Sequence, residues 1–181
     1  MMVPVAWRRV DTVGFERCEL TDGLDGYRLG GNLGLMEGGE SFDASYEVAC
    51  DSAWMTRSVV VELRGPEGEK GLRLAQRDGI WLVGGRADEA LGGCIDVDLG
   101  WTPSTNTLPI RRLGVAIGES RAVTAAWIRF PELTVEPLPQ EYTRLDERRY
   151  RYSSAGGRFV AELEVDEDGL VTTYGQIWTR A

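Results

Sequence analysis

The sequence predicts an all-β fold, a many-stranded antiparallel barrel-like roll with little or no helix. Three features indicate it: apolar and polar residues alternate with a period of two, turn signals rich in Gly and Asp separate the alternating segments, and no amphipathic helix of ordinary length is evident. With 181 residues, 43% hydrophobic and 27% charged, the chain has the composition of one folded domain over residues 1–181.

The alternation is clearest in segment 58–65, where Val59, Val61 and Leu63 share one face and their neighbours share the other. Segment 158–166 has the same pattern. Similar alternation occurs in segments 42–50, 71–76, 123–130 and 149–154. The turn signals between strands are Asp22-Gly23, Asp25-Gly26, Pro66-Glu67-Gly68, Asp78-Gly79, Gly156-Gly157 and Asp168-Gly169. Half-buried strands at this spacing are typical of a β-sandwich, roll or barrel.

Helix signals are weak. Segment 86–91 (RADEAL) could form one helical turn and is the best candidate. We expect segment 108–113 to be extended, because Pro103 and Pro109 disfavour a helix there.

The two halves of the chain show a faint internal similarity. RSVVVEL at 57–63 is followed by Gly-Leu and then Ile-Trp, and RFVAEL at 158–163 is followed by the same two pairs. An internal repeat over about 42–85 and 146–181 is one explanation. Chance is the other, since alternating strands resemble one another.

The charge and the residue types exclude several classes of function. A net charge of −9 argues against nucleic acid as the main partner, because phosphate binding needs a positive field. The absence of histidine excludes Ser-His-Asp and Cys-His catalysis and disfavours zinc. We therefore expect no metal, no cofactor and no catalytic residue of these kinds.

The location of the protein follows from the same composition. Cys18, Cys50 and Cys94 form no CxxC pair, so we expect reduced and mostly buried thiols. No window approaches the apolar length of a membrane span, and the first twenty residues lack the apolar region of a signal peptide. These features predict a cytoplasmic protein with no integral membrane segment.

The stretch 92–113, GGCIDVDLGWTPSTNTLPIRRL, concentrates the unusual chemistry. Asp96 and Asp98 flank Val97 in a strand-like run, so their side chains share one face. The hydroxyl and amide groups of segment 102–107 suit either a hydroxyl-rich ligand or a turn that satisfies its own backbone. In a strand, Arg111 and Arg112 would point to opposite faces, and at most one would point inward.

Three roles are open for the two carboxylates. They could act as acid and base on a sugar, if burial or mutual repulsion raised one pKa. They could bind a hard cation such as calcium. They could also pair with Arg111 and Arg112, or face water.

The chain resembles the bacterial "putative glycolipid-binding" family, formerly a domain of unknown function. The segments that carry the resemblance are 94–99 (CIDVDL), 102–113 (TPSTNTLPIRRL), 125–131 (AAWIRFP), 139–145 (PQEYTRL) with Tyr150-Arg151-Tyr152, and 166–178 (DEDGLVTTYGQIW). The resemblance is weaker before about residue 40. It implies a barrel-like shell of antiparallel strands able to hold an amphiphile.

These observations lead to a first hypothesis, non-catalytic binding of a glycolipid-like or other amphiphilic small molecule in a β-barrel cavity. Its candidate ligand-binding residues are Asp96, Asp98, Asn106, Arg111, Arg112, Tyr150, Tyr152 and Trp178. A carbohydrate- or lipid-acting hydrolase that uses Asp96 and Asp98 is the second hypothesis. A structural or interaction protein without a ligand is the third.

Overall fold

The computed structural model describes residues 1–181 and contains one sheet of fifteen strands. The first strands are β1 (Met2–Arg9), β2 (Gly14–Gly23), β3 (Gly26–Glu37), β4 (Glu40–Cys50), β5 (Thr56–Gly65), β6 (Gly68–Arg77), β7 (Ile80–Val83) and β8 (Arg86–Ala87). The others are β9 (Asp96–Leu99), β10 (Ser120–Ile128), β11 (Val135–Arg144), β12 (Arg149–Ser154), β13 (Phe159–Val165), β14 (Val171–Tyr174) and β15 (Trp178–Arg180). The helical segments are η1 (Glu89–Leu91), η2 (Ser104–Asn106), α1 (Thr107–Leu113) and η3 (Ala155–Gly157).

The sheet runs from β8 through β7 to β1, continues with β15, and then returns through β14 to β9. Every pairing is antiparallel except that of β9 with β10, which is parallel. The edge strands β8 and β9 do not pair, so the roll stays open. The backbone N–H of Val97 on β9 donates to Thr56 Oγ1 on β5 over 3.3 Å, so the second part of the sheet folds back onto the first. The all-β, barrel-like prediction is confirmed.

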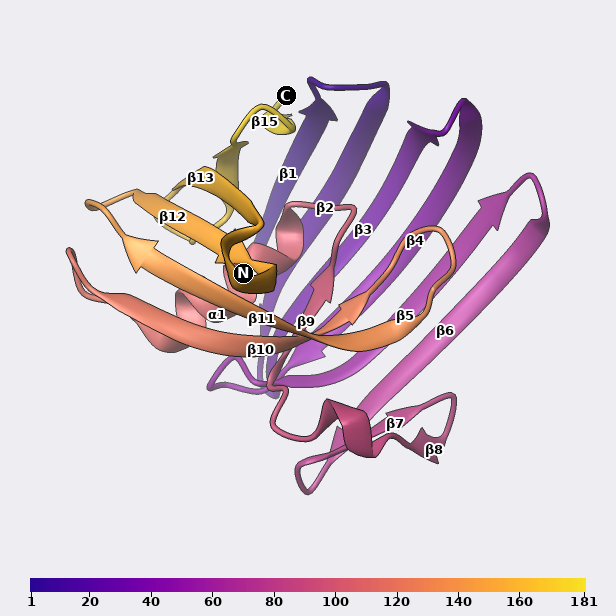
Figure 1. Cartoon of the computed structure of the whole chain (residues 1–181), viewed down its shortest axis with the longest axis horizontal. Helices are drawn as coiled ribbons and strands as arrows, with labels where there is room; N and C mark the ends of the chain where they lie inside the picture. The colour runs from indigo at the N-terminus through magenta and orange to yellow at the C-terminus, as the bar shows by residue number, and fades with distance from the viewer.

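Two hydrophobic cores fill this roll. The first core contains 29 buried residues, most of them from the inner face of β1–β7. The second core contains Ile110, Val115, Tyr142, Tyr150, Tyr152, Leu163, Val165 and Val171. Helix α1 gives Leu108 to the first core and Ile110 to the second, so it lies between them. In Figure 1, β1–β6 form one broad layer and β10–β13 cross in front of it.

The period-two reading of the strands is also confirmed. Val59, Val61 and Leu63 are almost fully buried, whereas the intervening Glu62 is exposed. All three cysteines are free and buried. None of the helical segments has the length and apolar character that a membrane-spanning helix needs.

The prediction of extended structure at 108–113 is wrong, because Thr107–Leu113 forms helix α1. Pro109 is tolerated there because it lies in the first turn, where the backbone N–H groups have no acceptor within the helix. The helix stops at Gly114, which adopts the left-handed conformation (φ 53°, ψ 41°) that favours glycine. Segment 86–91 is divided between β8 and the 3₁₀ turn η1.

Gly31 on β3 is required by close packing. A Cβ atom at this position would lie 2.3 Å from the ring of Tyr46, the residue opposite on β4. The Tyr46 hydroxyl donates to Glu16 Oε1 over 2.5 Å and lies 2.7 Å from Ser104 Oγ, so the ring cannot easily move aside. The glycine thus makes room for a buried tyrosine and its hydrogen bonds.

We expect Gly31→Ala to lower the free energy of unfolding by about 1–3 kcal/mol, the usual cost of overpacking. The neighbouring Gly30 offers a matched control, because a Cβ there meets nothing within 4 Å. Urea unfolding of both variants tests this. Equal losses in the two variants would show that the Tyr46 ring yields freely.

Candidate functional site

The two carboxylates of β9 face α1 and the second core. Val97 and Leu99, on the other face of the strand, are buried in the first core. Asp96 and Asp98 therefore share one face, as the sequence predicts. Strand β9 lies on the edge of the sheet, paired only with β10.

Asp96 forms a buried ion pair with Arg112 of α1. Arg112 Nε donates to Asp96 Oδ1 over 3.0 Å and Arg112 Nη2 donates to Oδ2 over 2.5 Å. The side chains are only 1% and 14% exposed for Asp96 and Arg112, respectively. Because both carboxylate oxygens are engaged, the pair fixes α1 against β9. This arrangement is the structural pairing that the sequence left open.

Asp98 has a different environment. Gln140 of β11 donates to Asp98 Oδ2 over 2.5 Å, and the Tyr152 hydroxyl also contacts the carboxyl group. Desolvation raises the pKa of Asp98 to about 6, although the hydrogen bonds from Gln140 and Tyr152 act in the opposite direction. The residue as a whole is of intermediate exposure, but its carboxyl group is desolvated and held by Gln140 and Tyr152.

The side chains of the Ser/Thr/Asn cluster mainly form hydrogen bonds with neighbouring protein groups. Asn106 accepts from the Tyr142 hydroxyl over 3.0 Å and donates to the carbonyl of Pro103 over 3.2 Å. Thr105 Oγ1 accepts from the backbone N–H of Leu99 over 3.2 Å. These contacts explain why the cluster is buried between the two cores.

A groove of about 380 Å³ opens beside these pairs, and we call it the α1 groove. Its lining residues are Gly93, Ile95, Arg112, Leu113, Ala122, Val123, Thr124, Pro139 and Gln140. Arg112 and Gln140 hold Asp96 and Asp98 directly. The remaining wall is largely apolar, so the groove combines a hydrogen-bonding end with apolar sides.

Three of the predicted residues lie elsewhere. Arg111 and Tyr150 line a separate surface groove of about 480 Å³, and Arg111 stacks over Trp54 with its guanidinium carbon 5.3 Å from the ring centre. Trp178 is buried in the first core. Arg111 and Arg112 face different surroundings, as predicted, but as neighbours on a helix rather than on a strand.

Sequence reasoning missed a buried acid in the first core. Glu16 of β2 is fully buried, and its Oε1 atom accepts from the hydroxyl groups of Tyr46 and Thr102 over 2.5 and 2.8 Å. Its Oε2 atom has no hydrogen-bond partner. Burial raises the pKa of Glu16 to about 7. The available signal was its position, because Glu16 lies two residues before Cys18 and four before Leu20 and so falls on the same inward face of β2.

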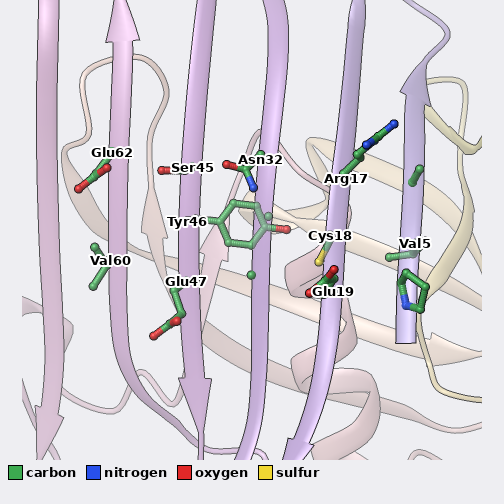
Figure 2. A pocket seen from close by; sticks show the side chains of 14 residues that line it. Val5, Arg17, Cys18, Glu19, Asn32, Ser45, Tyr46, Glu47, Val60 and Glu62 are labelled. Atoms are coloured by element: carbon green, nitrogen blue, oxygen red, sulfur yellow. The ribbon is translucent and has the colours of Figure 1, made fainter. Parts of the chain in front are cut away.

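A second missed feature lies on the outer face of β1–β6. Two adjoining hollows of about 890 and 950 Å³ share Arg17, Asn32, Ser45 and Glu62, and we call them together the outer trough. Figure 2 shows these four side chains in one row across neighbouring strands. The signal in the sequence was the segment 30–34, GGNLG. It holds three glycines, and they match no dinucleotide-binding or phosphate-binding pattern that would explain them.

No group of three or more His, Cys, Asp or Glu side chains is placed to hold a metal ion. The arrangement at β9 can instead bind hydroxyl groups. Carboxylate, amide and guanidinium groups meet there beside apolar surface.

Comparisons with known proteins agree with this architecture. No curated protein matches the chain. The crystal structure of a DUF1089 family protein from Pseudomonas aeruginosa is similar, with a TM-score of 0.86 and 35% sequence identity over 93% of this chain and 92% of that one. The family model described as "Putative glycolipid-binding" matches residues 4–180. The chain therefore belongs to this family.

Proposed function

We propose that this protein binds an amphiphilic, glycolipid-like molecule in the α1 groove without transforming it. The observation behind this proposal is that Arg112 and Gln140, the partners of Asp96 and Asp98, line a groove with largely apolar walls. The family description supports a binding role in general. The groove adds a place where a polar head and an apolar tail can be bound together.

The polar end supplies both donors and acceptors. Arg112 and Gln140 both line the groove; Arg112 is a donor, and the amide oxygen of Gln140 is an acceptor for a sugar hydroxyl, since its Nε2 atom donates to Asp98. The apolar end consists mainly of Ile95, Leu113 and Val123, which would cover an aliphatic chain. A ligand with one hydroxyl-rich end and one apolar end matches both surfaces.

Hydrolysis is the second candidate, and one observation favours it. Asp98, with its pKa of about 6, has the property of a general acid. A glycosidase also needs a second free carboxylate, and both oxygens of Asp96 are engaged by Arg112. We therefore expect no hydrolysis of chromogenic glycosides. Activity that Asp98→Asn abolishes would establish the enzyme instead.

We expect Ala122→Trp to weaken binding of octyl β-D-glucoside by at least about tenfold, a change of about 1.4 kcal/mol. Ala122 is exposed and lines the groove, so the indole would fill the groove without entering a core. Isothermal titration of detergent monomers measures the affinity. Native mass spectrometry of the freshly purified protein would show whether an amphiphile is carried from the cell.

The matched control is Ala87→Trp, which adds the same side chain to the exposed edge strand β8 away from the groove. It should bind as the parent does. Unchanged affinity in Ala122→Trp would contradict the assigned site, and no binding by the parent would favour a structural role. Arg111→Ala should leave binding intact, because Arg111 faces another groove.

A further inference from the structure

Three glycines lie on the floor of the outer trough, within the strands rather than at turns. Gly30 and Gly34 belong to β3 and Gly71 belongs to β6. All three line the trough. Gly30 is opposite Glu19 and Glu47, which are exposed, so its missing side chain would point outward.

The fold itself does not require these glycines. None of the three has the left-handed φ that favours glycine. A Cβ would meet nothing within 4 Å at Gly30, and only ordinary contacts of 3.5 and 3.7 Å at Gly34 and Gly71. Gly31 differs, because there the Tyr46 ring excludes any side chain.

Glycine inside a strand weakens the strand, since it adds backbone entropy to the unfolded chain and no packing to the folded one. Where sterics do not demand it, one established reason for a strand glycine is close approach of another molecule to the backbone. The three glycines leave a floor of bare backbone between longer side chains. This is the first argument for a ligand in the trough.

The second argument is a polar row across the floor. Glu62, Ser45, Asn32 and Arg17 stand opposite one another on β5, β4, β3 and β2. With strands about 4.8 Å apart, the row spans about 14 Å. The row presents a carboxylate, a hydroxyl, an amide and a guanidinium group to solvent, and these groups hydrogen-bond well to sugar hydroxyls (Figure 2).

The charges around the trough select the class of ligand. Its basic residues are Arg17, Arg64 and Lys70, and its acidic residues are Glu19, Asp43, Glu47, Glu62 and Glu69. An excess of carboxylates disfavours phosphates and other anions. Phe15, which is 44% exposed at one end of the trough, offers an aromatic face for a sugar ring.

From the glycine floor and the polar row we infer that the outer trough is a binding site for a neutral oligosaccharide. It is separate from the α1 groove and does not depend on the function proposed for that groove. The two share no lining residue. A chain of several sugar units fits a floor that crosses four strands.

The test is titration of the ¹⁵N-labelled protein with neutral tetrasaccharides: α-1,4-linked glucose, β-1,4-linked glucose and mannose. At least one should shift amide signals of β2–β5 in the trough. No shifts with any of them at millimolar concentration, or shifts confined to other surfaces, would overturn the inference.

The decisive variant is Gly30→Val. The added side chain points into open space and suits a strand, so the protein should unfold at the same or a higher urea concentration while binding falls at least about tenfold. Arg17→Ala should also weaken binding. Arg73→Ala, an exposed arginine on β6 outside the trough lining, is the matched control.

Binding by Gly30→Val equal to that of the parent would overturn the proposed floor. The two proposals fail separately. Ala122→Trp should keep tetrasaccharide binding while losing octyl glucoside, and Gly30→Val should show the reverse.

Discussion

Arg112→Met should lower the free energy of unfolding by about 3–5 kcal/mol, the usual cost of leaving a buried charge without its partner. Asp96 is 1% exposed and receives both of its side-chain hydrogen bonds from Arg112. The variant would also release α1 from β9, because the ion pair joins them. Urea unfolding followed by tryptophan fluorescence measures the loss.

A double-mutant cycle separates the pair from other effects. Asp96→Leu combined with Arg112→Met should be more stable than either single variant, since an apolar pair leaves no buried charge. Arg111→Met is the matched control, because that neighbouring arginine is exposed. A cost below about 1 kcal/mol for Arg112→Met would mean that water screens the pair.

Glu16→Gln should make the protein more stable at pH 8 by about 3 kcal/mol, because each pKa unit corresponds to about 1.4 kcal/mol. Burial raises the pKa of Glu16 from 4.5 to about 7. Between these values the folded protein keeps a proton that the unfolded chain has released. The free energy of unfolding therefore falls as pH rises from about 4.5 to 7 and then levels off.

Urea unfolding at several pH values from 4 to 8 tests this dependence. The decrease in the free energy of unfolding with rising pH should be smaller in Glu16→Gln, because the amide cannot lose a proton. Its oxygen can still accept hydrogen bonds from Tyr46 and Thr102. Glu19→Gln, which removes one exposed carboxylate from the same strand, is the control. Identical slopes in the parent and Glu16→Gln would show that the buried acid is neutralised in another way. Asp98, with its pKa of about 6, adds a smaller dependence of the same sign.

The strands were predictable because their signal is local. Alternating side chains, as at Val59, Val61 and Leu63, mark an inner and an outer face wherever one side of a sheet is buried. Helix α1 was not predicted, because seven residues carry too little periodicity and two prolines suggested an extended segment. Gly114 after Leu113 was a usable stop signal for that helix.

The site could be predicted only in part. The sequence placed Asp96 and Asp98 on one face and indicated that at most one of the two arginines points inward. It could not show that Arg112, sixteen residues away, engages both oxygens of Asp96. Gln140 is 42 residues from Asp98, and no local pattern announces that contact.

The sequence by itself determined the class of fold, the inner and outer faces of the strands and the stretch in which polar chemistry is concentrated. All three depend on neighbours within a few residues. Tertiary structure alone decided that the predicted residues divide among two grooves and two cores. It alone made Glu16 a buried acid beside Thr102, 86 residues away, and left Gly30 facing open space. Burial and pairing depend on how the sheet rolls, and that is settled by long-range packing of both cores.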